Sequence, residues 1–247
     1  MLQNTHAFVL KINPSGESSA NVHCFSRDYG KMILIAKGVR SAKSPFKGLI
    51  EPFSLLNVHF NEKKDRPYQF LANAEYLCPY TRLKQNPEAI LYGSVILEIL
   101  YKELEEQQNI PLFNLIHEVL NAIESGVPPK MAHWHFLLRF MEIEGQAFDT
   151  GVCHQCGAPL TGGSFLPRSG RLHCGDCRSE TSAPWELEAP LVSLLQVLSA
   201  GIPEQLPDLA AAPETGTLIN RILWNALAAR FDSCRTLRSV DILRKVL

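Results

Sequence analysis

The sequence predicts a multi-domain α+β protein, in which a small β-barrel or sandwich precedes a helical domain with an inserted four-cysteine metal ribbon. Residues 1–80 alternate between short apolar segments and turns, helical periodicity follows Pro79, and two Cys-x-x-Cys pairs interrupt the helical part. Strands first and helices afterwards favour separate domains over a βαβ sheet. We expect domains at residues 1–80, at 81–149 together with 181–247, and at 150–180.

Period-2 alternation and turn signals predict the strands. Phe8, Leu10 and Ile12 alternate with Val9 and Lys11, which is typical of a half-buried strand. The turn signals are Asn13-Pro14-Ser15-Gly16 and Asp28-Tyr29-Gly30. The expected strands are residues 8–12, 21–26, 32–36, 55–60 and 68–74. Five short strands without a helical pattern of comparable length indicate a small barrel or sandwich.

Helix start signals organise the rest of the chain. Asn86, Pro87 and Glu88 supply an N-cap, a proline at the first helical position and an acid in the first turn. Prolines at 111 and 128–129 begin two more helices in the same way. The expected helices are residues 86–107, 111–126, 128–145, 189–200 and 215–231, with a short one after Leu237. Residues 201–213 are expected to form a Pro/Ala-rich linker.

Composition and charge limit the function classes. The chain has 247 residues, 46% of them apolar, which excludes disorder as its main state. The formal net charge of −1 speaks against a nucleic-acid partner. Residues 1–80, however, hold 10 basic and 6 acidic residues, and residues 81–247 hold 14 and 19. A basic first domain, at +4, is therefore joined to an acidic remainder, at −5.

A basic segment accounts for the positive charge of the first domain. Its six cations stand against Asp28 alone. They are Arg27, Lys31, Lys37, Arg40, Lys43 and Lys47. The aromatic residues Phe25, Tyr29, Phe46 and Phe53 lie among or beside them. Cations that neutralise phosphates, beside rings that stack on bases, are what single-strand binding requires. A solvated loop with core aromatics remains the alternative.

Four cysteines predict a metal site. Cys153 and Cys156 form one pair and Cys174 and Cys177 a second, with 17 residues between the pairs. This spacing is typical of a Cys₄ zinc ribbon, and four soft thiolates suit one Zn²⁺ better than Mg²⁺ or Ca²⁺. Four cysteines close the coordination shell, so the zinc is expected to be structural.

The neighbouring histidines and the other three cysteines are not expected to bind the metal. A redox Cys-x-x-Cys pair is the alternative to the zinc site, but it requires a βαβ context that this segment lacks. His154 and His173 are not needed as ligands when four cysteines are present. Cys24, Cys78 and Cys234 are expected to be small buried hydrophobic residues.

Other motifs point away from catalysis and from membranes. No P-loop, Rossmann, H-E-x-x-H or G-x-S-x-G motif occurs, so we expect a protein that is not an enzyme. His133 and His135 are expected on different faces of an amphipathic helix, as a surface or partly buried pair. No secretory signal or long apolar segment is visible, so we expect a cytoplasmic protein with no membrane partner.

Several segments resemble a known family. Ala7–Leu10, Phe25–Lys31 and Ala36–Ser41 are similar to the N-terminal domain of the bacterial DNA repair protein RecO family. The similarity continues through Phe136–Gly145, the cysteine ribbon and Arg235–Ser239. The resemblance implies an N-terminal OB-fold barrel, a helical domain and an inserted zinc ribbon, and a five-stranded barrel fits an OB-fold independently.

The resemblance also implies a function. Members of the family are recombination mediators of the RecF pathway. They bind single- and double-stranded DNA, anneal complementary strands, and act with RecR to load recombinase onto strands coated with single-strand-binding protein. The basic residues after Arg27 become DNA-binding candidates, and a nucleoid-associated location follows. His135 and Arg139 stand where some members dock the acidic tail of single-strand-binding protein.

Two competing functions remain. A zinc-ribbon module that binds protein or RNA, without DNA annealing, also fits a barrel joined to a metal ribbon. A metal-dependent nucleic-acid enzyme is disfavoured, because four cysteines leave no open position on the metal.

Overall fold

The computed structural model describes residues 1–63, 66–177, 184–202 and 212–246. The chain divides into two compact units. The first unit holds residues 1–120 and 239–247, and the second holds residues 121–238. The predicted domain boundaries, including the one near residue 80, remain predictions. Residues 203–211 of the predicted linker, and the end of the predicted ribbon at 178–180, lie outside the described residues.

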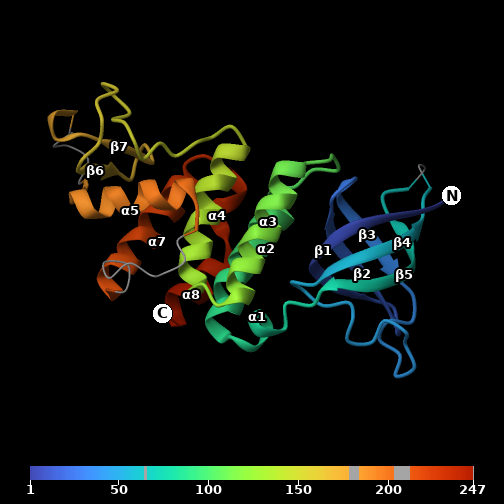
Figure 1. The fold of residues 1–247 in the computed structure, drawn as a ribbon. Helices are drawn as coiled ribbons and strands as arrows, with labels where there is room; N and C mark the ends of the chain where they lie inside the picture. The colour runs from blue at the N-terminus through green and yellow to red at the C-terminus, as the bar shows by residue number, and fades with distance from the viewer. Residues whose placement is uncertain (64–65, 178–183, 203–211, 247) are drawn as a thin grey trace. The chain divides into compact units, whose positions relative to one another are not determined.

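The N-terminal strands form a closed barrel in the order β1-β2-β3-β5-β4 (Figure 1). The strands are β1 (Leu2–Ser15), β2 (Ser19–Ser26), β3 (Gly30–Ala36), β4 (Leu55–Asn61) and β5 (Gln69–Cys78). All neighbours are antiparallel except β3 and β5, whose short parallel pairing closes the barrel. The prediction of an N-terminal OB-like barrel followed by a helical region is therefore confirmed.

The first strand is much longer than the alternation predicted. Residues Leu2 to Phe8 pair with β4, and Ala7 to Ser15 pair with β2, so one strand serves two neighbours. A bulge between Val9 and Lys11 bends the strand between its two partners. The polar residues at its start carry no apolar period, and backbone pairing makes them a strand.

The segment between β3 and β4 consists of successive turns. Backbone N–H groups of Ser41, Ser44 and Lys47 each donate to the carbonyl three residues earlier. Phe46 and Ile50 are buried and join the barrel core, which anchors the segment from inside. The chain here is thus a fixed series of turns that leaves its lysines at the surface.

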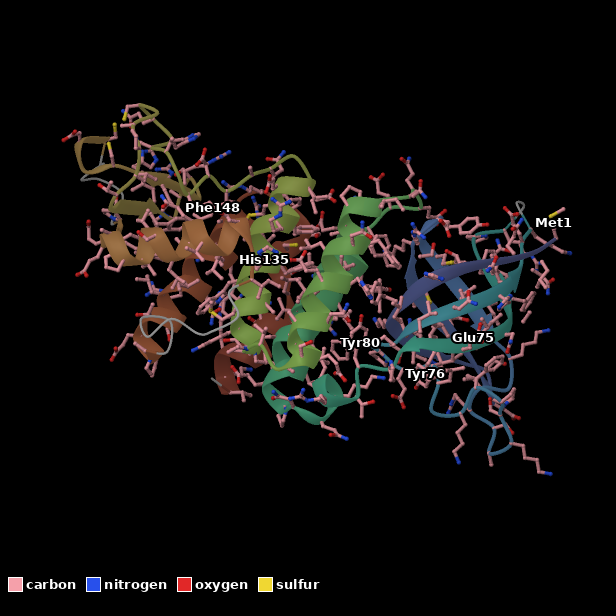
Figure 2. All side chains as sticks on the ribbon, in the orientation of Figure 1. Met1, Glu75, Tyr76, Tyr80, His135 and Phe148 are labelled. Atoms are coloured by element: carbon pink, nitrogen blue, oxygen red, sulfur yellow. The ribbon has the colours of Figure 1, made fainter. Side chains whose placement is uncertain are left out.

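The first unit also contains helices. They are α1 (Thr81–Gln85), α2 (Pro87–Glu103), most of α3 (Ile110–Ser125) and α8 (Arg238–Val246). Of these, α2 and α3 contact the barrel. The Asn86 side chain accepts hydrogen bonds from the N–H groups of Glu88 and Ala89, so the predicted N-cap is confirmed. Tyr80 is fully buried at the point where the chain passes from β5 to α1 (Figure 2).

Aromatic contacts hold α2 and α3 on the outer surface of β1 and β2. Phe8 and Phe25 oppose each other across β1 and β2, and the ring of Phe113 in α3 lies 4.9 and 5.6 Å from theirs. His23 meets Tyr101 of α2 edge-on, at 5.2 Å. The outer surface at this end of the barrel is therefore buried under helices.

The second unit combines helices with a small sheet. Its helices are α4 (Pro129–Ile143), α5 (Ala189–Ala200) and α7 (Pro213–Ala228), with 3-10 turns η1 (Gly175–Cys177) and η3 (Asp232–Thr236). Strands β6 (Gly163–Leu166), β7 (Arg171–His173) and β8 (Trp185–Leu187) form a sheet in the order β7-β6-β8, beside α5 in Figure 1. Strands β6 and β7 form a hairpin, and β8 adds a third strand that its three residues do not signal in the sequence.

Helix α4 is buried on nearly all sides, in contrast to the amphipathic helix that the sequence suggested. It packs against α5 and α7. His133 and His135 are 0% and 2% exposed, so the expected surface pair is wrong. Their ring nitrogens find partners within the unit: the indole N–H of Trp224 donates to His133 Nε2, and His135 Nδ1 lies 2.7 Å from the Leu198 carbonyl oxygen. No helix of the described residues is long and apolar enough to cross a membrane.

Candidate metal centre and nucleic-acid interface

The four ribbon cysteines come together in space. The Sγ atoms of Cys153, Cys156, Cys174 and Cys177 all lie within 4.8 Å of one another. Cys156 and Cys174 are separated by 3.7 Å between sulfurs, and all seven cysteines of the chain are free thiols. We refer to these four residues as the four-cysteine site.

Local backbone geometry creates the four-cysteine site. In the first knuckle, the N–H of Cys153 donates to the Ala158 carbonyl, and Gly157, at φ +73°, donates back to Cys153. The second knuckle closes through the N–H of Cys177 and the carbonyl of Cys174. Gly163 is required for packing, because a Cβ there would lie 2.2 Å from the His173 carbonyl oxygen. Short turns and one glycine thus aim both cysteine pairs at a common centre.

The donor set fits a tetrahedral metal. A zinc–sulfur distance of about 2.3 Å places the sulfurs of a tetrahedron about 3.8 Å apart, close to the separation of Cys156 and Cys174. Backbone hydrogen bonds already favour one thiolate. Burial raises the pKa of Cys153, but N–H donors of the backbone at Cys174, Cys156 and Gln155 outweigh it and lower the pKa to about 6. The four residues could therefore hold a metal ion, as the spacing predicted.

Two polar side chains anchor the ribbon to the helices. The Arg230 guanidinium donates to the carbonyls of Gln146, Gly170 and Ala226 at 2.8 to 2.9 Å, and it lies over the Phe148 ring, labelled in Figure 2. Gln196 of α5 donates to two further ribbon-side carbonyls. Burial lowers the pKa of Arg230 to about 10. Sequence reasoning missed both residues, because their partners are backbone atoms distant in sequence.

His173, next to Cys174 of the four-cysteine site, is not a surface residue. It is 6% exposed, its ring lies 5.9 Å from that of His154, and burial lowers its pKa. Its two ring nitrogens have no hydrogen-bond partner among the described residues. The cross-strand neighbour Ser164 also has an unpartnered buried hydroxyl. The four-cysteine site includes neither His154 nor His173.

The predicted DNA-binding residues separate into an exposed group and one covered residue. Five are exposed, and we refer to them as the barrel cations: Arg27, Lys37, Arg40, Lys43 and Lys47. Arg40 donates to the Gly16 carbonyl and so links the turn segment to the β1–β2 turn. Lys43 and Lys47 stand on the turns between β3 and β4, with their side chains toward solvent.

Lys31 lies apart from the other candidates. Its ammonium donates to the Tyr101 carbonyl oxygen at 2.5 Å and lies 4.9 Å from the centroid of the Tyr101 ring. Burial lowers its pKa. Lys31 therefore fastens β3 to the C-terminal end of α2, and the part played by this residue in DNA binding remains a prediction.

The structure adds an aromatic cluster that the sequence analysis did not identify. Lys37 Nζ lies 4.5 Å from the centroid of the Phe70 ring, and the Arg66 guanidinium lies 5.0 Å from Phe70 and 5.7 Å from Tyr68. We refer to Lys37, Arg66, Tyr68 and Phe70 as the β3–β5 aromatic cluster. In the sequence, Tyr68 and Phe70 alternate after a run of charged residues, and this alternation predicted only a strand.

The two residues proposed for the acidic tail differ in accessibility. His135 is buried against α5, as described, and Figure 2 shows it among the helices of the second unit. Arg139 is partly exposed and pairs with Glu142 one turn later. The two side chains therefore do not form a common surface, and a tail-docking role remains a prediction.

These features define a class of protein: an OB-like barrel joined to a helical part that carries a four-cysteine ribbon. The chain belongs to the recombination protein O family. Residues 1–80 match the family model described as recombination protein O N terminal, and residues 84–232 match recombination protein O C terminal.

Curated relatives match over most or all of the chain. The DNA repair protein RecO of Exiguobacterium sibiricum is 26% identical over 248 residues, 100% of this chain and 98% of the relative. That of Alkaliphilus metalliredigens is 26% identical over 100% of both chains. That of a Nocardioides species is 30% identical over 81% of this chain and 84% of its own. The resemblance predicted from individual segments is therefore confirmed.

Proposed function

We propose that the protein acts in DNA repair and recombination as a mediator that binds single- and double-stranded DNA and anneals complementary strands. With RecR, it helps to load recombinase onto strands coated with single-strand-binding protein. Family membership supports the role in repair and recombination. The observation that carries DNA binding is the exposure of five cations on a barrel whose acidic residues are few.

The proposed activity consists of binding and exchange, without a covalent step. DNA phosphates release counterions when lysines and arginines neutralise them, so a set of exposed cations suffices for affinity that depends on salt. The acidic remainder of the chain limits this affinity and confines it to the barrel.

We further propose that the four-cysteine site holds one structural Zn²⁺. Cys153, Cys156, Cys174 and Cys177 would supply all four ligands, and a metal with a closed shell supplies folding energy and no activated water. The ribbon strands are only three or four residues long and need such a cross-link.

The decisive experiment measures DNA affinity as a function of salt for the wild type and for Lys43→Ala/Lys47→Ala. Each lost phosphate contact lowers the slope of log K against log salt by about 0.7 to 0.9, so the double variant should lose about 1.5 units. Arg235→Ala/Lys245→Ala is the matched control, because it removes two exposed cations outside residues 1–80.

Strand annealing with and without single-strand-binding protein tests the mediator role. Annealing by the wild type that persists on coated strands supports the proposal. A wild type that shows no salt-dependent binding and no annealing would instead favour the protein-interaction module. Pull-down with purified RecR tests the partner directly.

A further inference from the structure

The outer surface of β3 and β5 is divided between a covered and an open end. Leu34 and Leu71 point into the barrel core, so the alternation of the strands turns Ile35 and Phe70 outward. These two are direct neighbours in the parallel pairing. At the other end of β3, Lys31 is fastened to α2, and helices bury the neighbouring rings. The open end therefore begins at Ile35 and Phe70.

The β3–β5 aromatic cluster occupies this open end. The rings of Tyr68 and Phe70 are half-buried and lie 6.1 Å apart at 80°. Lys37 and Arg66 lie over these rings, and among the described residues neither cation pairs with a carboxylate. Two cations that form no direct ion pair, beside two half-buried rings, make a surface with affinity for both the phosphate and the base of a nucleotide.

A hollow continues from the cluster along the barrel. It has a volume of about 180 Å³, and its lining combines Arg66 and Gln69 with the apolar side chains of Ile33 and Phe60 and with the carboxylates of Glu62 and Glu106. Arg66 thus lies between the rings and the hollow. The two carboxylates of the hollow repel a phosphate, so a nucleotide is expected on the side of Arg66 that faces the rings.

We propose that the β3–β5 aromatic cluster is a stacking site for unpaired nucleobases, with Lys37 and Arg66 on the adjoining phosphates. The inference rests on the proposed DNA binding and assigns it a preference for single strands. Bases of a duplex are stacked on one another and cannot reach Tyr68 or Phe70, whereas a single strand presents free base faces. A flexible lysine over a ring is a weak contact that a stacked base can replace.

The lysines of the turn segment and the two rings of the cluster therefore contact different parts of the DNA. Lys43 and Lys47 contact phosphates, which both forms of DNA present. Tyr68 and Phe70 contact bases, which only an unpaired strand presents. Annealing converts single strands, whose bases can stack on the protein, into a duplex, whose bases cannot. Loss of the stacking contacts on pairing would therefore favour release of the duplex.

The test uses the full chain and fluorescence anisotropy with an oligothymidine of about 16 nucleotides and a duplex of the same length. Tyr68→Leu and Phe70→Leu should each weaken single-strand binding by at least about fivefold, which corresponds to the lower end of the range for loss of one stacked base. Each should weaken duplex binding by less than about twofold. Tyr76→Leu is the matched control, because Tyr76 is an exposed aromatic residue of β5 outside the cluster. Its hydroxyl donates to the Gly48 carbonyl beside Lys47, so any effect of this variant should fall equally on single-strand and duplex binding.

A second readout follows stacking itself. Quenching of 2-aminopurine in the single strand should fall in Tyr68→Leu and return in Tyr68→Phe. Tyr68 precedes β5 and is half-exposed, so this variant tests the proposal even where Phe70→Leu disturbs the strand. Equal weakening of single-strand and duplex binding, or unchanged quenching, overturns the stacking site while leaving DNA binding intact. A wild type that binds no DNA overturns the proposed function as well.

Discussion

Two glycines with the same backbone conformation should respond differently to the same substitution. Gly30 and Gly38 both have φ +67°. A Cβ at Gly38 would meet nothing within 4 Å, whereas a Cβ at Gly30 would lie 2.1 Å from the Gln107 carbonyl oxygen. Gly30→Ala therefore forces the β2–β3 turn away from the segment after α2, and Gly38→Ala changes only the backbone energy.

The expected free energies of unfolding follow from these surroundings. An alanine at positive φ costs about 1–2 kcal/mol, of which a more restricted unfolded chain offsets about 0.4–1. Gly30→Ala adds overpacking of about 1–3 kcal/mol. It also endangers the hydrogen bond from the Lys31 N–H to the Glu105 carbonyl, worth about 0.5–1.5 kcal/mol. Gly30→Ala should thus be about 2–4 kcal/mol more destabilising than Gly38→Ala.

Calorimetric unfolding of both variants measures the difference. A change of 1 kcal/mol shifts the Tm of a chain of this size by about 2–4 °C, so Gly30→Ala should melt about 4–16 °C below Gly38→Ala. Equal Tm values for the two variants would refute the reasoning, because the contact with Gln107 and the neighbouring Lys31–Glu105 hydrogen bond should destabilise only Gly30→Ala.

Three further predictions concern the metal, an anchoring residue and pH. Removal of zinc by a chelator should release one metal ion per chain, lower the Tm and make four more thiols reactive, as thiol titration would show; unchanged titration excludes the site. Arg230→Met should destabilise the protein by about 2–4 kcal/mol in denaturant unfolding, and Arg235→Met, at an exposed ion pair, by less than about 1. Burial, then Lys11 and Lys31, lower the pKa of His23, so the folded state binds fewer protons than the unfolded state. This contribution is complete above about pH 6.5 and is lost as pH falls below it, so His23→Gln should flatten the acid limb; parallel curves would contradict this.

Local signals predicted the helices of the chain well. The cap at Asn86 and the prolines after 110 and 128 act within a few residues of the helix starts, so α2, α3 and α4 begin within one residue of the predicted positions. The four-cysteine site was equally predictable from the sequence, because the fixed spacing within each pair by itself brings two cysteines together. Zinc as its metal remains a prediction.

Features that depend on distant partners were not predictable. The first strand extends to Leu2 only because β4 pairs with it, and β8 exists only because β6 offers an edge. Burial of α4 on several sides depends on α5 and α7, which lie far along the chain. The covered position of Lys31 likewise depends on Tyr101, seventy residues away. The sequence-based prediction grouped Lys31 with the solvent-facing cations, because it used charge alone.

The aromatic contacts between the barrel and its helices determine whether the barrel can be studied as a separate fragment. Phe8 and Phe25 are fully buried in the chain, and the ring that covers both belongs to Phe113. A fragment that ends at residue 80 would carry this apolar surface into water and associate through it. DNA contacts mapped on such a fragment would include a surface that the whole protein covers with its own helices.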